Sequence, residues 1–298
     1  MEFFSPWLSP HRLGRLALIA LLPAGLLRAV EDPVAVFSQV FNGYARTRLP
    51  DKSFKPEAYT FGEGGCWSRP VKDAALEEMK FLRVAQAVAA PLAHLNYRPA
   101  RNSAEAELLI LVFWGSTEGS RDNDPSQSTD RAASAMGLYN NLKPVDPKTP
   151  QSTEADVAQA SLDSALWQLS LANEERDRLD DRNARILGYS DVVDRARSAA
   201  HMSFARDILA EVGDNRYYVV LQAYDFKTAA KEKKLKPLWT ARISMVEAGH
   251  DFARSLDTML RTAAPYLGQD SDGLNRYVVP EGRVEIGPAK VVEPPPAK

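Results

Sequence analysis

The sequence predicts an α+β protein in which helices pack on a mixed β-sheet. Residues 108–114 are seven consecutive apolar residues, and residues 217–224 are rich in aromatic and β-branched side chains, so both runs read as strands. Apolar residues recur at helical spacing in residues 73–95 and 251–266, which predicts helices that cover the sheet. A long charged segment separates the two strands. We therefore expect a helical insertion before a C-terminal β-hairpin and helix.

Length and composition exclude some classes of protein. The chain has 298 residues, is 45% hydrophobic and carries a formal net charge of -2, which is typical of a folded globular protein. With so small a net charge, the protein as a whole does not attract nucleic acid electrostatically. Its only cysteine is Cys66, so no internal disulfide can form and packing must hold the fold together.

Residues 1–29 carry the pattern of an export signal. Arg12 and Arg15 precede an apolar run at residues 16–27, and Ala29 supplies a small residue for cleavage. A membrane-spanning helix needs roughly 20 apolar residues, whereas the apolar part of a secretory signal has about 7 to 15. We therefore expect a cleaved signal peptide, a location in the periplasm or cell envelope, and no transmembrane span in the mature chain. The alternative is an amphipathic or buried N-terminal helix.

The first half of the mature chain predicts a strand–helix–strand unit. Residues 33–49 show helical spacing, and residues 59–61 read as a short strand that stops at the glycines of residues 62–65. The helix at 73–95 contains Pro91, which should kink or end it. The two strands on either side of this helix should be parallel, so that both finish at one edge of the sheet.

The second half predicts the insertion and the hairpin. Residues 117–152 read as loop, residues 153–187 as a charged helix with Asp181 and Arg185 four apart, and residues 191–212 as a further helix. In the strand around Trp239, apolar and polar residues alternate, which predicts one buried and one wet face. We divide the chain into four parts, which are a signal peptide (1–29), a core domain (30–125 and 211–276), a helical insertion (126–210) and a Pro-rich disordered tail (277–298).

The parallel strands suggest a ligand site at the edge where they end. Ligands favour the carboxyl edge of the strands in open α/β sheets. The candidate binding residues in the loops expected there are Glu63, Trp67, Trp114, Ser116 and Thr117. A hydrolase that uses Ser116 or Glu63 in this cleft is an alternative function. The simpler alternative is that the glycines only turn the chain and the tryptophans belong to the core.

A cationic segment lies between the two hairpin strands. Its five lysines are Lys227, Lys231, Lys233, Lys234 and Lys236. They suggest binding to an anionic surface, such as lipid headgroups or wall polymers. The alternative is that the lysines keep a long hairpin soluble and protect its edge from pairing with another chain. The segment has no aromatic residue to stack on bases and no arginine, so nucleic-acid binding is disfavoured.

Other chemistry has no support in the sequence. His94, His201 and His250 do not have metal-ligand spacing, so we expect no metal site. The glycines at 62–65 do not form a dinucleotide-binding fingerprint, because Trp67 stands where the third glycine should be. We predict no cofactor and assign no catalytic residue.

The order of these elements resembles a class of small exported bacterial envelope proteins of unknown function. The resemblance is carried by the helix at 73–95, the run ELLILVFWG, and the dipeptide Leu238-Trp239 in the second hairpin strand. The first function that we expect is that of a non-enzymatic envelope or periplasmic protein with a binding or structural role, which binds through the helical insertion or the glycine-loop edge. Its partner would be another envelope protein, a wall component or a lipid. The sequence departs from the lipoproteins of this class because Cys66 is far from the predicted cleavage site, and because it carries the long insertion.

Overall fold

A computed structural model describes residues 33–67, 73–123, 126–144, 150–199 and 202–279, all of which belong to one compact unit. The predicted signal peptide and residues 280–298 of the predicted tail lie outside this part. Within it, no helix combines the length and the apolar character that crossing a lipid bilayer requires.

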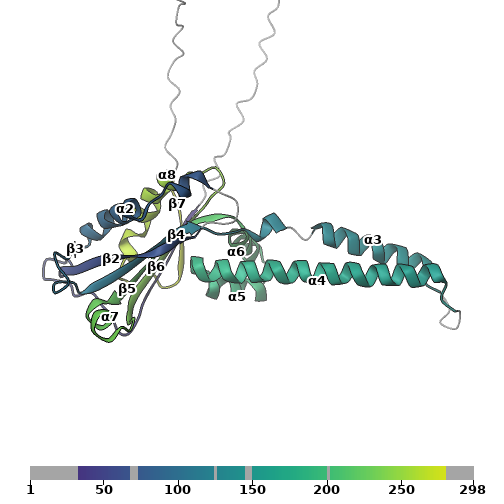
Figure 1. Ribbon diagram of the computed structural model, residues 1–298, viewed down its shortest axis with the longest axis horizontal. Helices are drawn as coiled ribbons and strands as arrows, with labels where there is room; N and C mark the ends of the chain where they lie inside the picture. The colour runs from purple at the N-terminus through teal and green to yellow at the C-terminus, as the bar shows by residue number, and fades with distance from the viewer. Residues whose placement is uncertain (1–32, 68–72, 124–125, 145–149, 200–201, 280–298) are drawn as a thin grey trace, which may run out of the picture. The chain divides into compact units, whose positions relative to one another are not determined.

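One mixed seven-stranded sheet organises the described residues, which confirms the predicted α+β class (Figure 1). Its spatial order is β3-β2-β4-β5-β6-β1-β7. β2 pairs in parallel with β3 and β4, and the remaining neighbours are antiparallel. The strands are β1 (Pro33–Val40), β2 (Glu57–Trp67), β3 (Tyr97–Pro99), β4 (Leu108–Ser116), β5 (Arg216–Asp225), β6 (Pro237–Val246) and β7 (Leu274–Val278).

The helix predicted for residues 33–49 is wrong, because this segment begins with β1, which lies between β6 and β7. Val34, Ala35 and Val36 are all buried, since β1 is covered on both faces of the sheet. A strand covered on both faces loses the alternation of apolar and polar residues, so its sequence can mimic helical spacing.

The glycines at 62–65 do not end the second strand. β2 continues through them to Trp67, with a register shift between Glu63 and Gly65. A Cβ added to Gly62 would lie 2.6 Å from the Leu111 side chain, and one added to Gly64 would lie 2.6 Å from the Phe113 ring. The glycines therefore make room for β4 side chains inside the sheet, and the predicted loop is strand.

Three helices cover what we call the first face of the sheet. They are α1 (Ala74–Glu77), α2 (Phe81–His94) and α8 (Phe252–Ala263), which the 3-10 helix η2 (Ala264–Tyr266) extends. Their core with the sheet includes Val88, Leu92, Met259 and the fully buried Trp239. The closing helix is as predicted, but the helix expected at 73–95 is broken into α1 and α2. Pro91 lies inside α2, which ends at His94.

The helical insertion contacts the opposite, second face of the sheet. The helices between β4 and β5 are η1 (Ser120–Asn123), α3 (Ser126–Leu142), α4 (Thr153–Leu187), α5 (Ser190–Ser198) and α6 (Ser203–Gly213), and the predicted insertion, residues 126–210, runs from α3 into α6. α4 has the predicted bounds, α3 replaces part of the predicted loop, and the single helix predicted for 191–212 is two. The second face of β6 is not wet as predicted, since the insertion leaves Thr240 5% and Ser244 0% exposed.

α4 is much longer than the part of it that the sheet supports. Its 35 residues span about 50 Å. Near its C-terminus, Leu179, Asn183 and Leu187 are buried, and the Asn183 amide donates to the Glu118 carbonyl at 2.8 Å. Its N-terminal half lies along α3 instead (Figure 1). The helix ends at Gly188, which adopts a left-handed conformation with φ 81°.

Two connections differ from the prediction. The β5–β6 hairpin forms, but its lysine segment begins with α7 (Phe226–Glu232), which Asp225 caps by accepting from the Thr228 amide at 2.7 Å. After η2 the chain returns to the sheet as β7 and pairs with β1. Tyr277 and Val278, which were expected in the disordered tail, belong to this strand.

Two glycines test how closely β2 and β4 approach each other. Gly115 has φ +155° and a Cβ there would collide with the Trp67 carbonyl, whereas Gly65 has φ +135° and open space. We expect Gly65→Ala to cost about 1 kcal/mol through its backbone conformation alone. Gly115→Ala should cost at least about 3 kcal/mol, because the strands must also separate. Urea unfolding measures both values. Equal costs would contradict the close approach.

Candidate functional site

The structure does not bring the five predicted ligand-binding residues together. Trp67, at the end of β2, is 67% exposed and lines a pocket on the second face. Glu63 and Trp114 line a different hollow of about 450 Å³ beside α1 and α2, on the first face. Ser116 and Thr117 are buried in the sheet, 5% and 3% exposed. The predicted single cleft is therefore replaced by two surfaces on opposite faces.

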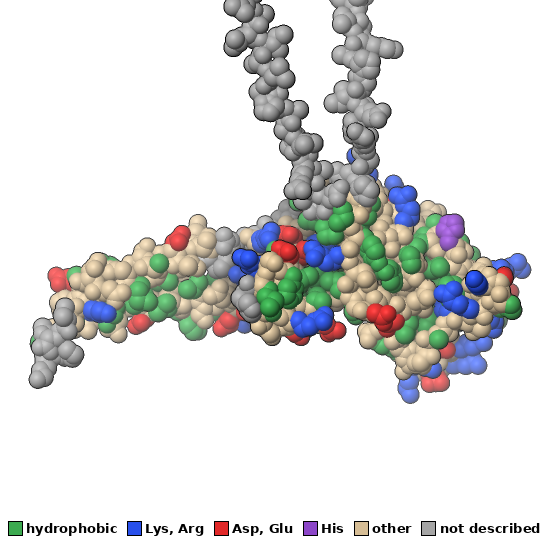
Figure 2. Space-filling view, turned by 180° about the vertical axis from the view of Figure 1, so that it is seen from behind, with side chains coloured by type: hydrophobic (Ala, Val, Ile, Leu, Met, Phe, Trp, Pro, Cys, Tyr) green, Lys and Arg blue, Asp and Glu red, His purple; other side chains and the backbone are tan. Residues whose placement is uncertain are grey.

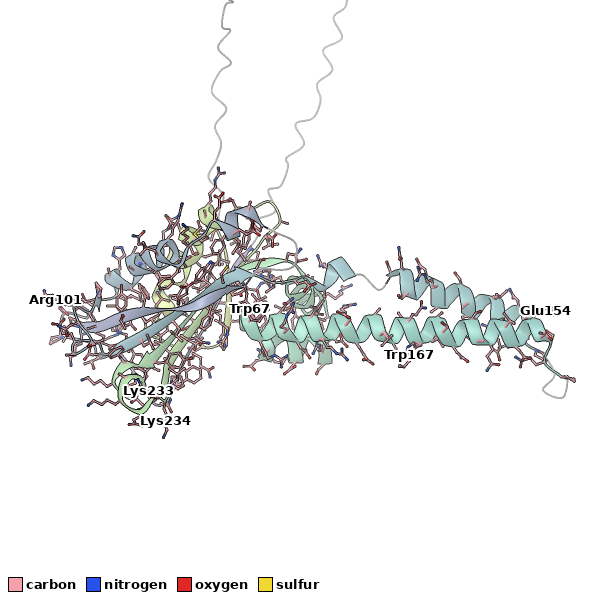
Figure 3. All side chains as sticks on the ribbon, in the orientation of Figure 1. Trp67, Arg101, Glu154, Trp167, Lys233 and Lys234 are labelled. Atoms are coloured by element: carbon pink, nitrogen blue, oxygen red, sulfur yellow. The ribbon has the colours of Figure 1, made fainter. Side chains whose placement is uncertain are left out.

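The pocket that contains Trp67 has a volume of about 360 Å³, within the range of small-molecule sites. Figure 3 shows Trp67 near the C-terminal end of α4, which supplies one wall. Most of the lining is apolar and comes from strands β2, β4 and β5, whereas the polar groups come from β5, β6 and α4. We call this site the arginine pocket, and its residues are Trp67, Phe113, Arg185, Ile186, Tyr218, Val220, Gln222 and Arg242.

The end of α4 and the glycines of β2 explain why this part of the sheet is hollow. Gly188 ends α4 against β1, where a Cβ would lie 2.6 Å from the Phe37 side chain. Gly64 has no side chain that could fill the space over β2, so the Phe113 ring extends across it. The floor of the pocket is consequently apolar.

The electrostatic feature of the pocket is Arg242. Its Nε donates to the Arg185 carbonyl at 3.2 Å, in the last turn of α4. Burial lowers the pKa of the Arg242 guanidinium, and the nearby Tyr224 offsets only part of this effect. Among the described residues, no carboxylate forms an ion pair with Arg242. Arg242 is half-buried, and a cation that is partly removed from water without a counterion is costly, since arginine keeps its charge at any ordinary pH.

Arg185 adds a second unmatched charge at the rim. The sequence places it four residues after Asp181, but Asp181 accepts from Arg197 at 2.7 Å instead. No described carboxylate lies within ion-pair distance of Arg185. Two guanidinium groups with a glutamine beside an apolar floor are suited to a molecule that has an apolar body and an anionic head.

Sequence reasoning found Trp67 but missed the arginines. Arg242 occupies the polar position in the alternating pattern of β6, so it was expected to face water. The signal that was available is its neighbourhood, because Arg242 pairs with Val220 of β5 and Phe37 of β1 across the sheet. An arginine whose neighbours on both adjacent strands are apolar indicates that this face of the sheet is covered by another part of the protein.

The hydrolase alternative gains no support from the geometry. The Ser116 Oγ is buried and makes no hydrogen bond with any described residue, so it has no base to activate it. Glu63 is exposed on the other side of the sheet from the arginine pocket. Across the described ranges, no three His, Cys, Asp or Glu side chains are grouped so that they could hold a metal ion.

The five lysines lie around α7, at one end of the β5–β6 hairpin. All are exposed, and Figure 3 shows Lys233 and Lys234 at the tip, away from Trp67. Leu235 among them is 55% exposed. The lysines therefore form a surface separate from the arginine pocket. Binding of this surface to anionic material and its alternative, protection of the hairpin, both stay predictions.

Comparisons with known proteins do not identify a family. No family model matches the chain, and no curated protein matches it in sequence. A solved structure described as a PDZ domain protein from Parabacteroides distasonis is similar at a TM-score of 0.35 and 8% sequence identity. The match covers 83% of this chain and 40% of the solved chain, so this chain spans less than half of that protein.

Replacing Arg242 tests whether its charge is unmatched in the empty pocket. We expect Arg242→Met to stabilise the protein by up to about 1 kcal/mol, because the side-chain stem is kept and the desolvated charge is removed. The matched variant is Arg216→Met. Arg216 is 1% exposed and donates to Ser244 Oγ at 3.3 Å and to the Pro33 carbonyl at 3.4 Å, so its loss should cost about 2 kcal/mol. Urea unfolding distinguishes the two signs, and a similar loss for both variants would contradict this account of Arg242.

Proposed function

We propose that the protein is an exported, non-enzymatic binding protein that holds an amphipathic anion in the arginine pocket. The observation that carries this proposal is Arg242, a half-buried guanidinium that lines an apolar pocket and has no carboxylate partner among the described residues. A ligand that brings a carboxylate or phosphate supplies the missing charge, and its apolar body covers Phe113 and Val220.

The geometry suggests a division of roles within the pocket. The Arg185 carbonyl fixes the Nε of Arg242, which leaves its two terminal nitrogens for a bidentate contact with the anionic head. Gln222 lies on the same face of the sheet and offers an amide to the same group. Trp67, at 67% exposure, is the wall that a bound apolar body would cover.

Export is supported by the sequence of residues 1–29, with two arginines before a short apolar run and a small residue at its end. An exported binding protein meets amphipathic anions as lipid fragments and fatty acids of the envelope. This compartment therefore agrees with the chemistry of the pocket, and a partner in the envelope would deliver or receive the ligand.

Four probes that each contain a ten-carbon chain test the ligand class: decanoate, whose carboxyl carbon is the tenth, decyl phosphate, decanol and decyltrimethylammonium. We expect both anions to bind at least about tenfold more tightly than decanol, because a hydrogen bond to a charged group contributes about 1.5 kcal/mol or more. The ammonium compound should bind least. Tryptophan fluorescence follows the titrations, and Trp67→Phe should remove most of the signal. Equal affinities for decanoate and decanol would show that the arginines do not select the ligand.

Variants of two arginines locate the anionic head. Arg242→Gln should weaken decanoate binding at least about tenfold and leave decanol binding unchanged. Arg178→Gln is the control, because Arg178 lies on the same insertion but is 78% exposed and pairs with Glu174 at 3.3 Å. If both substitutions weaken decanoate binding equally, the effect is one of net charge and the proposed site is wrong.

The mature N-terminus tests the compartment separately from the ligand. Cell fractionation followed by intact mass should find the protein outside the cytosol and beginning near residue 30. A cytosolic protein that retains its initiator methionine contradicts the export part of the proposal, whatever the titrations show.

A further inference from the structure

The α3–α4 hairpin has almost no core of its own. We call α3 together with residues 153–171 of α4 the arm. The buried residues between its two helices are mostly alanines, with one larger side chain, Leu162. The alanines of this seam are Ala132, Ala155, Ala158 and Ala165. Small residues allow close packing of the two helices, but they leave little apolar area inside the pair.

The arm instead exposes large apolar side chains on its outside. Leu138 is 51%, Val157 62% and Leu171 46% exposed. Figure 2 shows hydrophobic side chains along the arm. Single exposed apolar residues are common, but a repeated pattern of them on one helix indicates a contact surface.

These side chains follow the helical repeat. Val157 and Leu171 are fourteen residues apart, which is two heptads, so they lie on one side of α4. Val157 directly precedes Ala158, which is one of the residues buried in the seam between the two helices. Because one residue turns an α-helix by about 100°, Val157 lies to one side of this seam. On α3, Leu138 directly precedes Tyr139, which is half-buried against α4.

Residues that precede the seam on both helices share one side of the arm. The reason is that α3 and α4 run in opposite directions, so equal rotations along the two chains lead to the same side of the plane through their axes. Leu138, Val157 and Leu171 therefore lie on one side of the arm, which they share with the polar Ser161, Ser164 and Gln168 and which we call the arm face. Leu166 directly follows the seam residue Ala165 and lies on the opposite side, and the 66% exposed Trp167 comes next to it in the chain.

The arm face has opposite charges at its two ends. Glu154 precedes Ala155 at the start of α4, and Arg131 precedes Ala132 near the start of α3. Because the helices are antiparallel, Glu154 lies at the tip of the arm and Arg131 toward its base; Figure 3 shows Glu154 at the end remote from the sheet. Neither forms an ion pair within the described part of the chain.

From this arrangement we propose that the arm face binds the arm face of a second copy of this chain, with the two arms antiparallel. A twofold axis across the middle of the arm brings each Glu154 to the Arg131 of the partner copy and packs Leu138, Val157 and Leu171 between four helices. The result is a four-helix bundle, which gives each thin hairpin the core that it lacks.

The size of the arm face fits a weak but specific dimer. Each helix of the arm is about 25 Å long and about 10 Å wide, so the face of the two helices together presents about 500 Å². Two such faces bury about 1,000 Å², which is near the lower limit for specific interfaces, so we expect a micromolar dissociation constant. A parallel arrangement would place Glu154 against Glu154 and is disfavoured.

Sedimentation velocity of the purified full chain between about 1 and about 100 µM tests the proposal over the range that such an interface implies. We expect a concentration-dependent shift from monomer to dimer. Leu171→Glu should leave a monomer over this range. Leu166→Glu is the matched control, because Leu166 is on the same helix and similarly exposed, at 42% against 46%, but lies on the opposite side. It should dimerise like the unchanged protein, and circular dichroism should show the same helix content for both.

The charges give a second, independent comparison. Arg131→Glu should raise the dissociation constant about tenfold, and adding Glu154→Arg to it should restore dimerisation, because the swapped charges meet again in an antiparallel pair. A monomer at all concentrations overturns the proposal. So does equal weakening by the Leu166 and Leu171 substitutions.

Discussion

The constraint on which the second face of the sheet depends is the length of α4 and the place where it stops. In the last turns of this helix Leu187 packs on the sheet, Asn183 donates to Glu118 after β4 and to Val212 of α6, and Gly188 ends the helix against Phe37. One end of the helix thus leaves an uncovered apolar hollow, and the other end extends beyond the sheet with α3 as its only described neighbour. The arginine pocket and the arm face are two consequences of one helix that does not match the sheet it packs on.

The two faces of the sheet are covered by helices in different ways. On the first face, α2 and α8 bury Trp239 and Ile243 completely, and the buried Arg46 beside this core pairs with Glu57 at 3.6 Å. On the second face, the insertion covers polar positions of β5 and β6, so Arg216 finds hydrogen-bond partners while Arg242 keeps only the Arg185 carbonyl and an open hollow. Neither arginine pairs with a described carboxylate, but Arg216 donates to three oxygens of the protein, whereas Arg242 donates to one and lines an open pocket. This difference is the physical basis for the proposed ligand site.

The sequence predicts the elements with simple patterns and fails where two faces are covered or where a distant segment decides burial. The runs of β4, β5, α4 and α8 are recognisable because their periodicity or apolar length is clear. β1 was mistaken for a helix because burial on both faces removes its alternation, and the glycines of β2 were mistaken for a turn because only the neighbouring strand shows what they make room for. Trp67 was predicted as a binding residue because it was expected in a loop at the carboxyl edge of the sheet, whereas in the structure it belongs to β2 and lines a pocket on the second face. Arg185 and Arg242 were missed, since their environment comes from segments 57 residues apart in the chain.

An NMR titration of the protein with decanoate tests whether the arginine pocket binds the anion. The Arg242 Nε–H and the Trp67 indole N–H should shift together and saturate at one equivalent. Signals from the lysines around α7 and from the buried Trp239 should stay in place. Shifts confined to the lysines, or spread evenly over the surface, would contradict the assignment of the arginine pocket as the binding site.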